Sequence, residues 1–126
     1  MISNPEELVK LMNDIYKMSE LAEEFMYMLA LNTRGRVLGV FELGHGTVNH
    51  CLISEREVMI RALLCGAVSI VLVHNHPSGC PEPSNPDFEI FHRINEGCRF
   101  IGISLLDNII IAGDTYFSFK EKGYLG

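Results

Sequence analysis

An apolar run that ends abruptly in two histidines constrains this chain most. Residues 68–73 are Val-Ser-Ile-Val-Leu-Val, and His74, Asn75 and His76 follow directly. A nearly continuous, β-branched run of this length predicts a strand that is covered on both faces, as in the centre of an α/β sheet. His74 and His76 are two residues apart, so both side chains point to the same face if the strand continues. The sequence therefore predicts two imidazoles at the rim of a central strand.

Three helices are expected around this strand. The first should begin near Pro5, which suits a first helical turn, and it carries apolar residues at helical spacing as far as Met18. The second follows a capping box at residues 54–57 and stops at Gly66. The third should begin near Asp87, after a loop that holds four of the five prolines.

Short apolar runs predict the remaining strands, at residues 25–31, 37–43, 47–53, 101–106, 108–111 and 116–119. A helix between strands in this order suggests a βαβ-like crossover. With 126 residues, the chain fits one α/β domain with a mixed sheet and flanking helices. We expect an N-terminal helix within residues 1–19 and the main domain at residues 20–126.

Composition narrows the classes of function. The chain has 10 basic and 16 acidic residues and a net charge of −6, which argues against direct nucleic-acid binding by this domain alone. No apolar stretch approaches the ~20 residues of a membrane helix, and the N-terminus lacks the pattern of a secretory signal. The four cysteines form no Cys-x-x-Cys pair, so we expect reduced thiols, no zinc finger and a cytoplasmic location.

The two histidines form half of a plausible metal site. Asp87 is the natural third ligand, because the proline-stiffened loop can return it to the end of the strand. A His₂Asp set leaves a coordination position for water, as catalytic zinc sites do. The alternative is structural: most His-x-His pairs are not ligands, and Ser84-x-x-Asp87 is also a capping box that needs no metal.

The whole pattern, His74-x-His76-x₇-Ser84-x-x-Asp87, resembles the JAMM motif of the JAB/MPN metalloprotease superfamily. The wording His-Asn-His-Pro-Ser-Gly resembles the bacterial RadC family in particular, over roughly residues 20–126. The resemblance implies a cytidine-deaminase-like architecture with Zn²⁺ held by His74, His76 and Asp87. It also implies that Ser84 stabilises the oxyanion.

The superfamily's general acid/base is a glutamate at the start of the first strand. Glu24 fits that place, and Glu42, near the end of the second strand, is the alternative. Two features depart from RadC-like sequences. Only about 20 residues precede the first strand, and the usual helix-hairpin-helix region is not among them. The chain is therefore either a fragment of a longer RadC-like protein or a short member of the family. Asn108 stands where a histidine is usual.

Three functions are weighed. The first is a zinc-dependent metallohydrolase that cleaves peptide or isopeptide bonds in a protein or peptide substrate. The second is a non-catalytic scaffold or DNA-repair accessory module of the RadC family. The third, a nucleobase deaminase, is rejected because its His-x-Glu and Pro-Cys-x-x-Cys signature is missing. Substrate and oligomeric state are left open.

Overall fold

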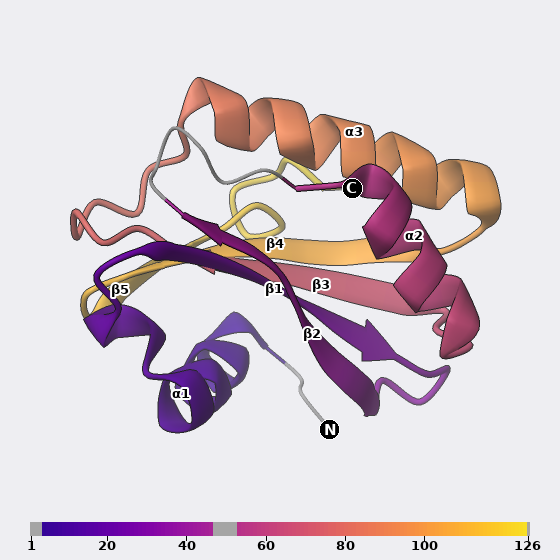
Figure 1. Cartoon of the computed structure of the whole chain (residues 1–126), viewed down its shortest axis with the longest axis horizontal. Coiled ribbons are helices and arrows are strands. Elements are labelled where there is room, and N and C mark those ends of the chain that lie inside the picture. Colours follow the sequence, from indigo (N-terminus) through magenta and orange to yellow (C-terminus); the bar gives the residue numbers. More distant parts are fainter. Residues whose placement is uncertain (1–3, 47–52, 126) are drawn as a thin grey trace.

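A computed structural model of the chain describes residues 4–46 and 53–125 (Figure 1). The strand predicted at residues 47–53 lies almost entirely outside these described residues. The other predicted elements can be compared with the structure.

The described residues form a five-stranded mixed sheet with strand order β2-β1-β3-β4-β5. β1 is antiparallel to both β2 and β3, β3 and β4 are parallel, and β5 returns antiparallel to β4. The strands are β1 Glu24–Leu31, β2 Val37–Gly46, β3 Ser69–Asn75, β4 Ser104–Ala112 and β5 Thr115–Ser118. The predicted α/β class with a mixed sheet is therefore confirmed.

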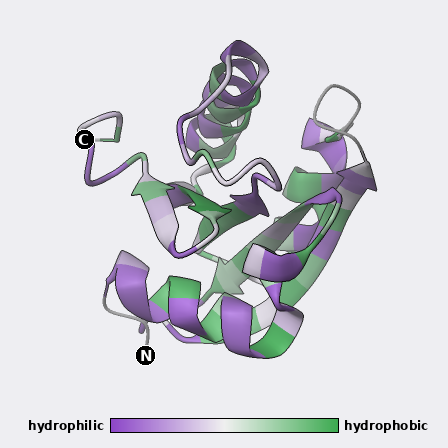
Figure 2. Ribbon diagram, turned by 90° about the vertical axis from the view of Figure 1, so that its left-hand side faces the viewer, coloured by the Kyte–Doolittle hydropathy of each residue, from purple (hydrophilic) through white to green (hydrophobic). Residues whose placement is uncertain are grey.

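β3 lies at the centre of the sheet, and all seven of its residues are buried. Its side chains alternate between two cores: Ile70 and Leu72 face one side, and Val71 and Val73 face the other. Helices α2 (Glu55–Leu64) and α3 (Asn85–Ile101) cover the first face, and α1 (Pro5–Tyr16) covers the second (Figure 1). Figure 2 shows mostly hydrophobic strands between helices whose colours alternate, as amphipathic helices require.

The connections between the elements explain why the start of α3 lies near the carboxyl end of β3. α2 joins β2 to β3, which run in the same direction because each is antiparallel to β1. α3 then crosses from β3 to its parallel neighbour β4. The start of α3 therefore follows the carboxyl end of β3 closely, which is where α/β folds place their sites.

Two details of the C-terminal half differ from the prediction. The two strands expected at residues 101–106 and 108–111 are one strand, β4. In addition, α3 continues to Ile101, where the first of these strands was expected to begin. Gly97 lies inside α3, where an added Cβ would come within 2.8 Å of Met59 Cε, so the end of the Met59 side chain of α2 packs against this glycine. Asp107 does not interrupt β4, because Ser118 Oγ and Lys120 N donate hydrogen bonds to its carboxylate.

The N-terminal helix forms as its signals predict. The Asn4 side chain accepts a hydrogen bond from Glu7 N at 2.9 Å, and Leu8 and Met12 are buried against the sheet. The helix ends at Tyr16, and a 3₁₀ turn then brings Met18 into the same core. Among the described residues, no helix is long and apolar enough to span a membrane.

Candidate metal centre

Four side chains that are far apart in the sequence meet at the carboxyl end of β3. Glu24 is at the start of β1, and His74 is near the end of β3. His76 is the first residue after β3, and Asp87 lies in the first turn of α3. One ligand atom from each lies within 4.8 Å of the others, and three of the four residues are buried. The structure thus brings together the three predicted zinc ligands and the predicted general base.

The register of β1 on β3 places Glu24 in this group. Met26 pairs with His74 in the antiparallel ladder, and Glu24, two residues before Met26, lies just beyond this last pair. Glu24 shares a face with Met26 and Met28, which belong to the core beneath α2 and α3. Its Oε1 lies 3.9 Å from His74 Nε2, and its side chain is only 5% exposed.

Asp87 is both a helix cap and a member of the group. Ser84 Oγ accepts a hydrogen bond from Asp87 N at 3.2 Å, and Ser84 N donates one to Asp87 Oδ2 at 2.9 Å, which completes a capping box. The same carboxylate places Oδ2 3.0 Å from His76 Nε2 and Oδ1 3.3 Å from His74 Nε2. The capping box is therefore compatible with a role of Asp87 as a metal ligand, because both use the same carboxylate.

The backbone of the loop fixes the orientation of His76. His76 Nδ1 lies 2.9 Å from the carbonyl oxygen of Cys80 and can only donate to it. Nε2 then faces the Asp87 carboxylate, and in a neutral ring this would set a lone pair against an anion. A proton or a metal ion between the two atoms removes that conflict, as in carboxylate–histidine–metal arrangements.

Two carboxyl groups in this site have pKa values shifted in opposite directions. Burial raises the pKa of Glu24, although the charges of His74 and His76 partly oppose it. Burial alone would also raise the pKa of Asp87, but the two histidines and Ser84 N outweigh it and hold this pKa far below the usual range. For His76, burial favours a lower pKa, yet hydrogen bonds with Asp87 and the Cys80 carbonyl raise it.

Three buried polar atoms in the site make no hydrogen bond among the described residues, although His74 Nε2 has ion-pair contacts with Asp87 and Glu24. Both ring nitrogens of His74 and Oε2 of Glu24 make no hydrogen bond, although each is shielded from solvent. Such atoms are costly to bury unpaired. Two imidazoles and a carboxylate are the donor set that zinc accepts, with Glu24 beside them, so the residues present fit a metal ion.

The other candidate side chains lie elsewhere. The Glu42 carboxylate is 46% exposed and lies 3.4 Å from His45 Nδ1, outside the group of four. The Cys80 thiol is also outside the group, and this residue instead accepts the hydrogen bond from His76 Nδ1 through its carbonyl oxygen. Asn108 is buried in β4, and neither polar atom of its side chain has a partner among the described residues.

Sequence reasoning missed one residue of the motif. Asn75 Oδ1 accepts a hydrogen bond from Phe25 N at 2.7 Å, and Asn75 Nδ2 donates one to the Glu23 carbonyl at 2.9 Å. These bonds connect the end of β3 to the start of β1. The position of Asn75 between the two histidines is the only sequence signal for such a role. Its hydrogen-bond partners could not be predicted from sequence, because they are 50 and 52 residues away.

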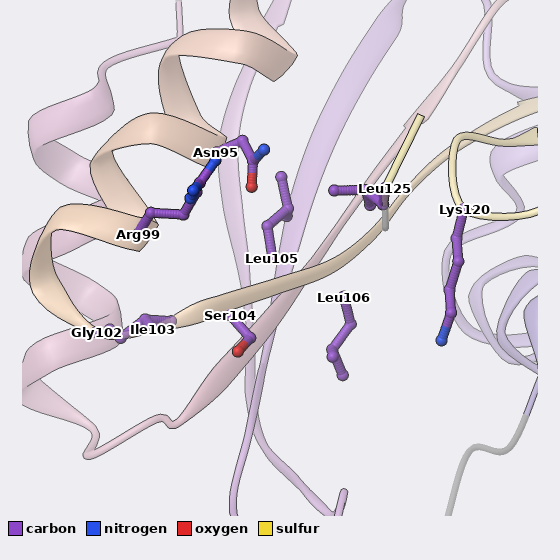
Figure 3. A pocket seen from close by; sticks show the side chains of 9 residues that line it. All are labelled: Asn95, Arg99, Gly102, Ile103, Ser104, Leu105, Leu106, Lys120 and Leu125. Carbon is purple, nitrogen blue, oxygen red and sulfur yellow. The ribbon is translucent and has the colours of Figure 1, made fainter. Parts of the chain in front are cut away.

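A cavity of about 750 Å³ lies at the opposite end of the sheet (Figure 3). Asn95 and Arg99 of α3, the first residues of β4 and Lys120 line it. Ser104 pairs with Ser69 at the first residue of β3, whereas His74 lies near the last. This cavity is therefore separate from the four-residue group.

Comparison with known proteins agrees with this geometry. The family model described as RadC-like JAB domain matches residues 2–124. The chain belongs to this family. The resemblance inferred from the His-Asn-His-Pro-Ser-Gly stretch is thus confirmed, and the sheet and helices are consistent with the JAB/MPN fold.

Curated relatives of this RadC-like JAB domain carry the name UPF0758 protein. Those of Clostridium acetobutylicum and Halalkalibacterium halodurans are each 40% identical over 124 residues, covering 98% of this chain and 53% of the relative. The relative from Methanococcoides burtonii is 35% identical over 127 residues, covering 97% of this chain and 56% of its own length. The chain thus spans about half the length of these relatives, whose names state no activity.

Proposed function

We propose that this RadC-like JAB domain is a zinc-dependent hydrolase of peptide or isopeptide bonds. The observation that carries the proposal is the convergence of Glu24, His74, His76 and Asp87 within 4.8 Å, with buried nitrogen and oxygen atoms that make no hydrogen bond among the described residues. His74, His76 and Asp87 would hold the ion. Glu24 would stand beside it as the general acid/base.

Zinc in such a donor set supplies a Lewis acid and makes hydroxide available near neutral pH. Glu24 takes a proton from the attacking water and later delivers it to the leaving amine as the C–N bond breaks. Its raised pKa suits a group that must both accept and release a proton near neutrality. Ser84 Oγ accepts from Asp87 N, and its O–H has no acceptor among the described residues, so it could donate to the developing oxyanion.

Metal analysis is the first test. Protein purified without chelator, or titrated with zinc after dialysis against EDTA, should bind one ion per chain. His76→Ala or Asp87→Ala should abolish that binding, whereas Glu24→Gln should retain it. A chain that never takes up a stoichiometric ion would instead favour the scaffold or DNA-repair accessory role.

An unbiased peptide-library screen, extended to isopeptide-linked substrates, is the second test. Zinc-loaded wild type should cleave a subset of the library, and Glu24→Gln should lose nearly all of that cleavage while keeping the metal. Glu42→Gln is the matched control, because it makes the same change at an exposed position outside the site. Full activity in Glu24→Gln and its loss in Glu42→Gln would transfer the role to Glu42.

A further inference from the structure

The side chain of Asn75 pairs with the backbone of β1 just beyond the end of the β1–β3 ladder, where a backbone partner from β3 would otherwise lie. The β1–β3 ladder has its last pair at Met26 and His74. Beyond it, the chain stays paired with β4 on its other side, where His76 N donates a hydrogen bond to the Ile111 carbonyl at 2.9 Å. The Asn75 amide fills the gap on the β1 side, and its two bonds continue the hydrogen-bonding pattern of the ladder.

These two bonds hold the backbone on either side of Glu24. One involves the N–H of the following residue, Phe25, and the other involves the C=O of the preceding residue, Glu23. Asn75 is itself 1% exposed and lies between the two histidines of the site. Its planar amide therefore ties the position of Glu24 to the segment that carries the metal-binding imidazoles.

Only a side chain with both a donor and an acceptor can make this bridge. Alanine makes neither bond, and aspartate keeps the acceptor for Phe25 N but loses the donor for the Glu23 carbonyl. The start of β1 is also paired with β2, where Glu24 is opposite Gly46 and Phe25 is opposite His45. Loss of the amide should therefore loosen the placement of Glu24 over the site without unfolding the sheet.

We propose that Asn75 is a positioning residue for Glu24: it fixes the general acid/base relative to the metal ligands and touches neither metal nor substrate. This inference rests on the proposed hydrolase function. It predicts that Asn75 acts on turnover only through Glu24. Misplacing a catalytic group by about 1 Å costs on the order of 10²-fold in rate.

The kinetic test is a double-mutant cycle on the zinc-loaded chain. Asn75→Ala should lower kcat by about 10²-fold with KM and zinc affinity changed less than about threefold. In the Glu24→Gln background the same substitution should have no further effect on kcat. Additive losses, or a loss of zinc as complete as in His76→Ala, would overturn the proposal.

Asn32→Ala is the matched control. The Asn32 side chain accepts from Arg34 N and Arg36 N at 2.9 and 3.0 Å, in the turn at the other end of β1. Its loss removes two side chain-to-backbone bonds without touching the site, so kcat should stay at the wild-type value. A comparable fall in kcat in Asn32→Ala would mean that strand stability alone explains the Asn75 effect.

A second readout does not depend on turnover. In Co²⁺-loaded protein, paramagnetic relaxation of the ¹³C-labelled Glu24 side chain reports its distance from the metal. Asn75→Ala should weaken that relaxation, whereas Asn32→Ala should not; unchanged relaxation in Asn75→Ala refutes the proposal. If wild type cleaves nothing, the proposed hydrolase function fails, and this measurement still decides the role of Asn75. Asn75→Asp serves the same tests if the alanine variant does not fold.

Discussion

Replacing Ser84 by alanine separates its structural contact from its proposed chemical role. Ser84 Oγ caps the 17-residue helix α3 by accepting from Asp87 N at 3.2 Å. The other half of the capping box, from Ser84 N to Asp87 Oδ2, uses the backbone and survives the substitution. The variant should therefore lose one cap bond and one hydroxyl donor, while Asp87 keeps its orientation toward the histidines.

The size of each loss follows from these contacts. A serine N-cap replaced by alanine costs about 1 kcal/mol of unfolding free energy, which is about 4 °C in melting temperature for a domain of this length. The cost should be the same with and without zinc, since Ser84 is not a ligand. If its hydroxyl stabilises the oxyanion, kcat should fall by about 10²-fold or more.

Ser54→Ala is the matched control for this experiment. Ser54 Oγ caps α2 by accepting from Glu57 N at 3.3 Å, and neither residue belongs to the group of four. Both variants should lose about 1 kcal/mol in thermal unfolding followed by circular dichroism. Only Ser84→Ala should lose turnover, assayed well below either melting temperature.

Two results would refute this reasoning. Wild-type kcat in Ser84→Ala would leave Ser84 as a helix cap alone. Loss of zinc in Ser84→Ala as complete as in Asp87→Ala would show that the ligand set has been assigned wrongly.

Two further predictions concern stability, each measured by urea unfolding of the metal-free protein. The pKa of His76 is raised above its ordinary 6.5, so the stability that protonated His76 contributes should be full below pH 6.5 and should be lost as the pH rises through the raised pKa. Added zinc should remove this loss. A metal-free unfolding free energy that does not change over this pH range would contradict the prediction. Asn108→Leu should raise the unfolding free energy by about 1 kcal/mol, because both polar atoms of Asn108 are buried without a described partner; a clear loss would reveal an unrecognised partner.

The features that local sequence could predict are those whose causes are local. The apolar run before His74 predicts β3, and the Ser84–Asp87 spacing predicts the start of α3, because alternation and capping depend on neighbouring residues. The single strand β4 was not predictable in this way. Asp107 suggests a break in the apolar pattern, and the groups that satisfy it, Ser118 and Lys120, lie 11 and 13 residues further on.

The choice between Glu24 and Glu42 shows the same limit within the site. Both lie on strands, but β1 separates β2, which carries Glu42, from β3, and the register of β1 on β3 brings Glu24 to His74. Register is a long-range property that side-chain alternation along one strand does not fix. The resemblance to a family placed a glutamate at the start of the first strand, and the pairing of Met26 with His74 supplies the physical reason.

The opposite pKa shifts of Glu24 and Asp87 support a division of roles between two carboxylates in one site. A carboxylate that binds a metal must be ionised, and the two histidines and Ser84 N keep Asp87 ionised against the cost of burial. A general acid/base must exchange a proton near neutrality, and burial moves the pKa of Glu24 upward, toward that range. Pairs of titratable groups whose environments separate their pKa values are a recurring sign of acid/base assignment in enzymes. A helix cap alone does not account for the two imidazoles within 3.3 Å of the Asp87 carboxylate, and a surface position does not account for Glu24 Oε2, which is buried without a hydrogen bond among the described residues. The two carboxylates together thus favour a hydrolytic metal centre over a scaffold.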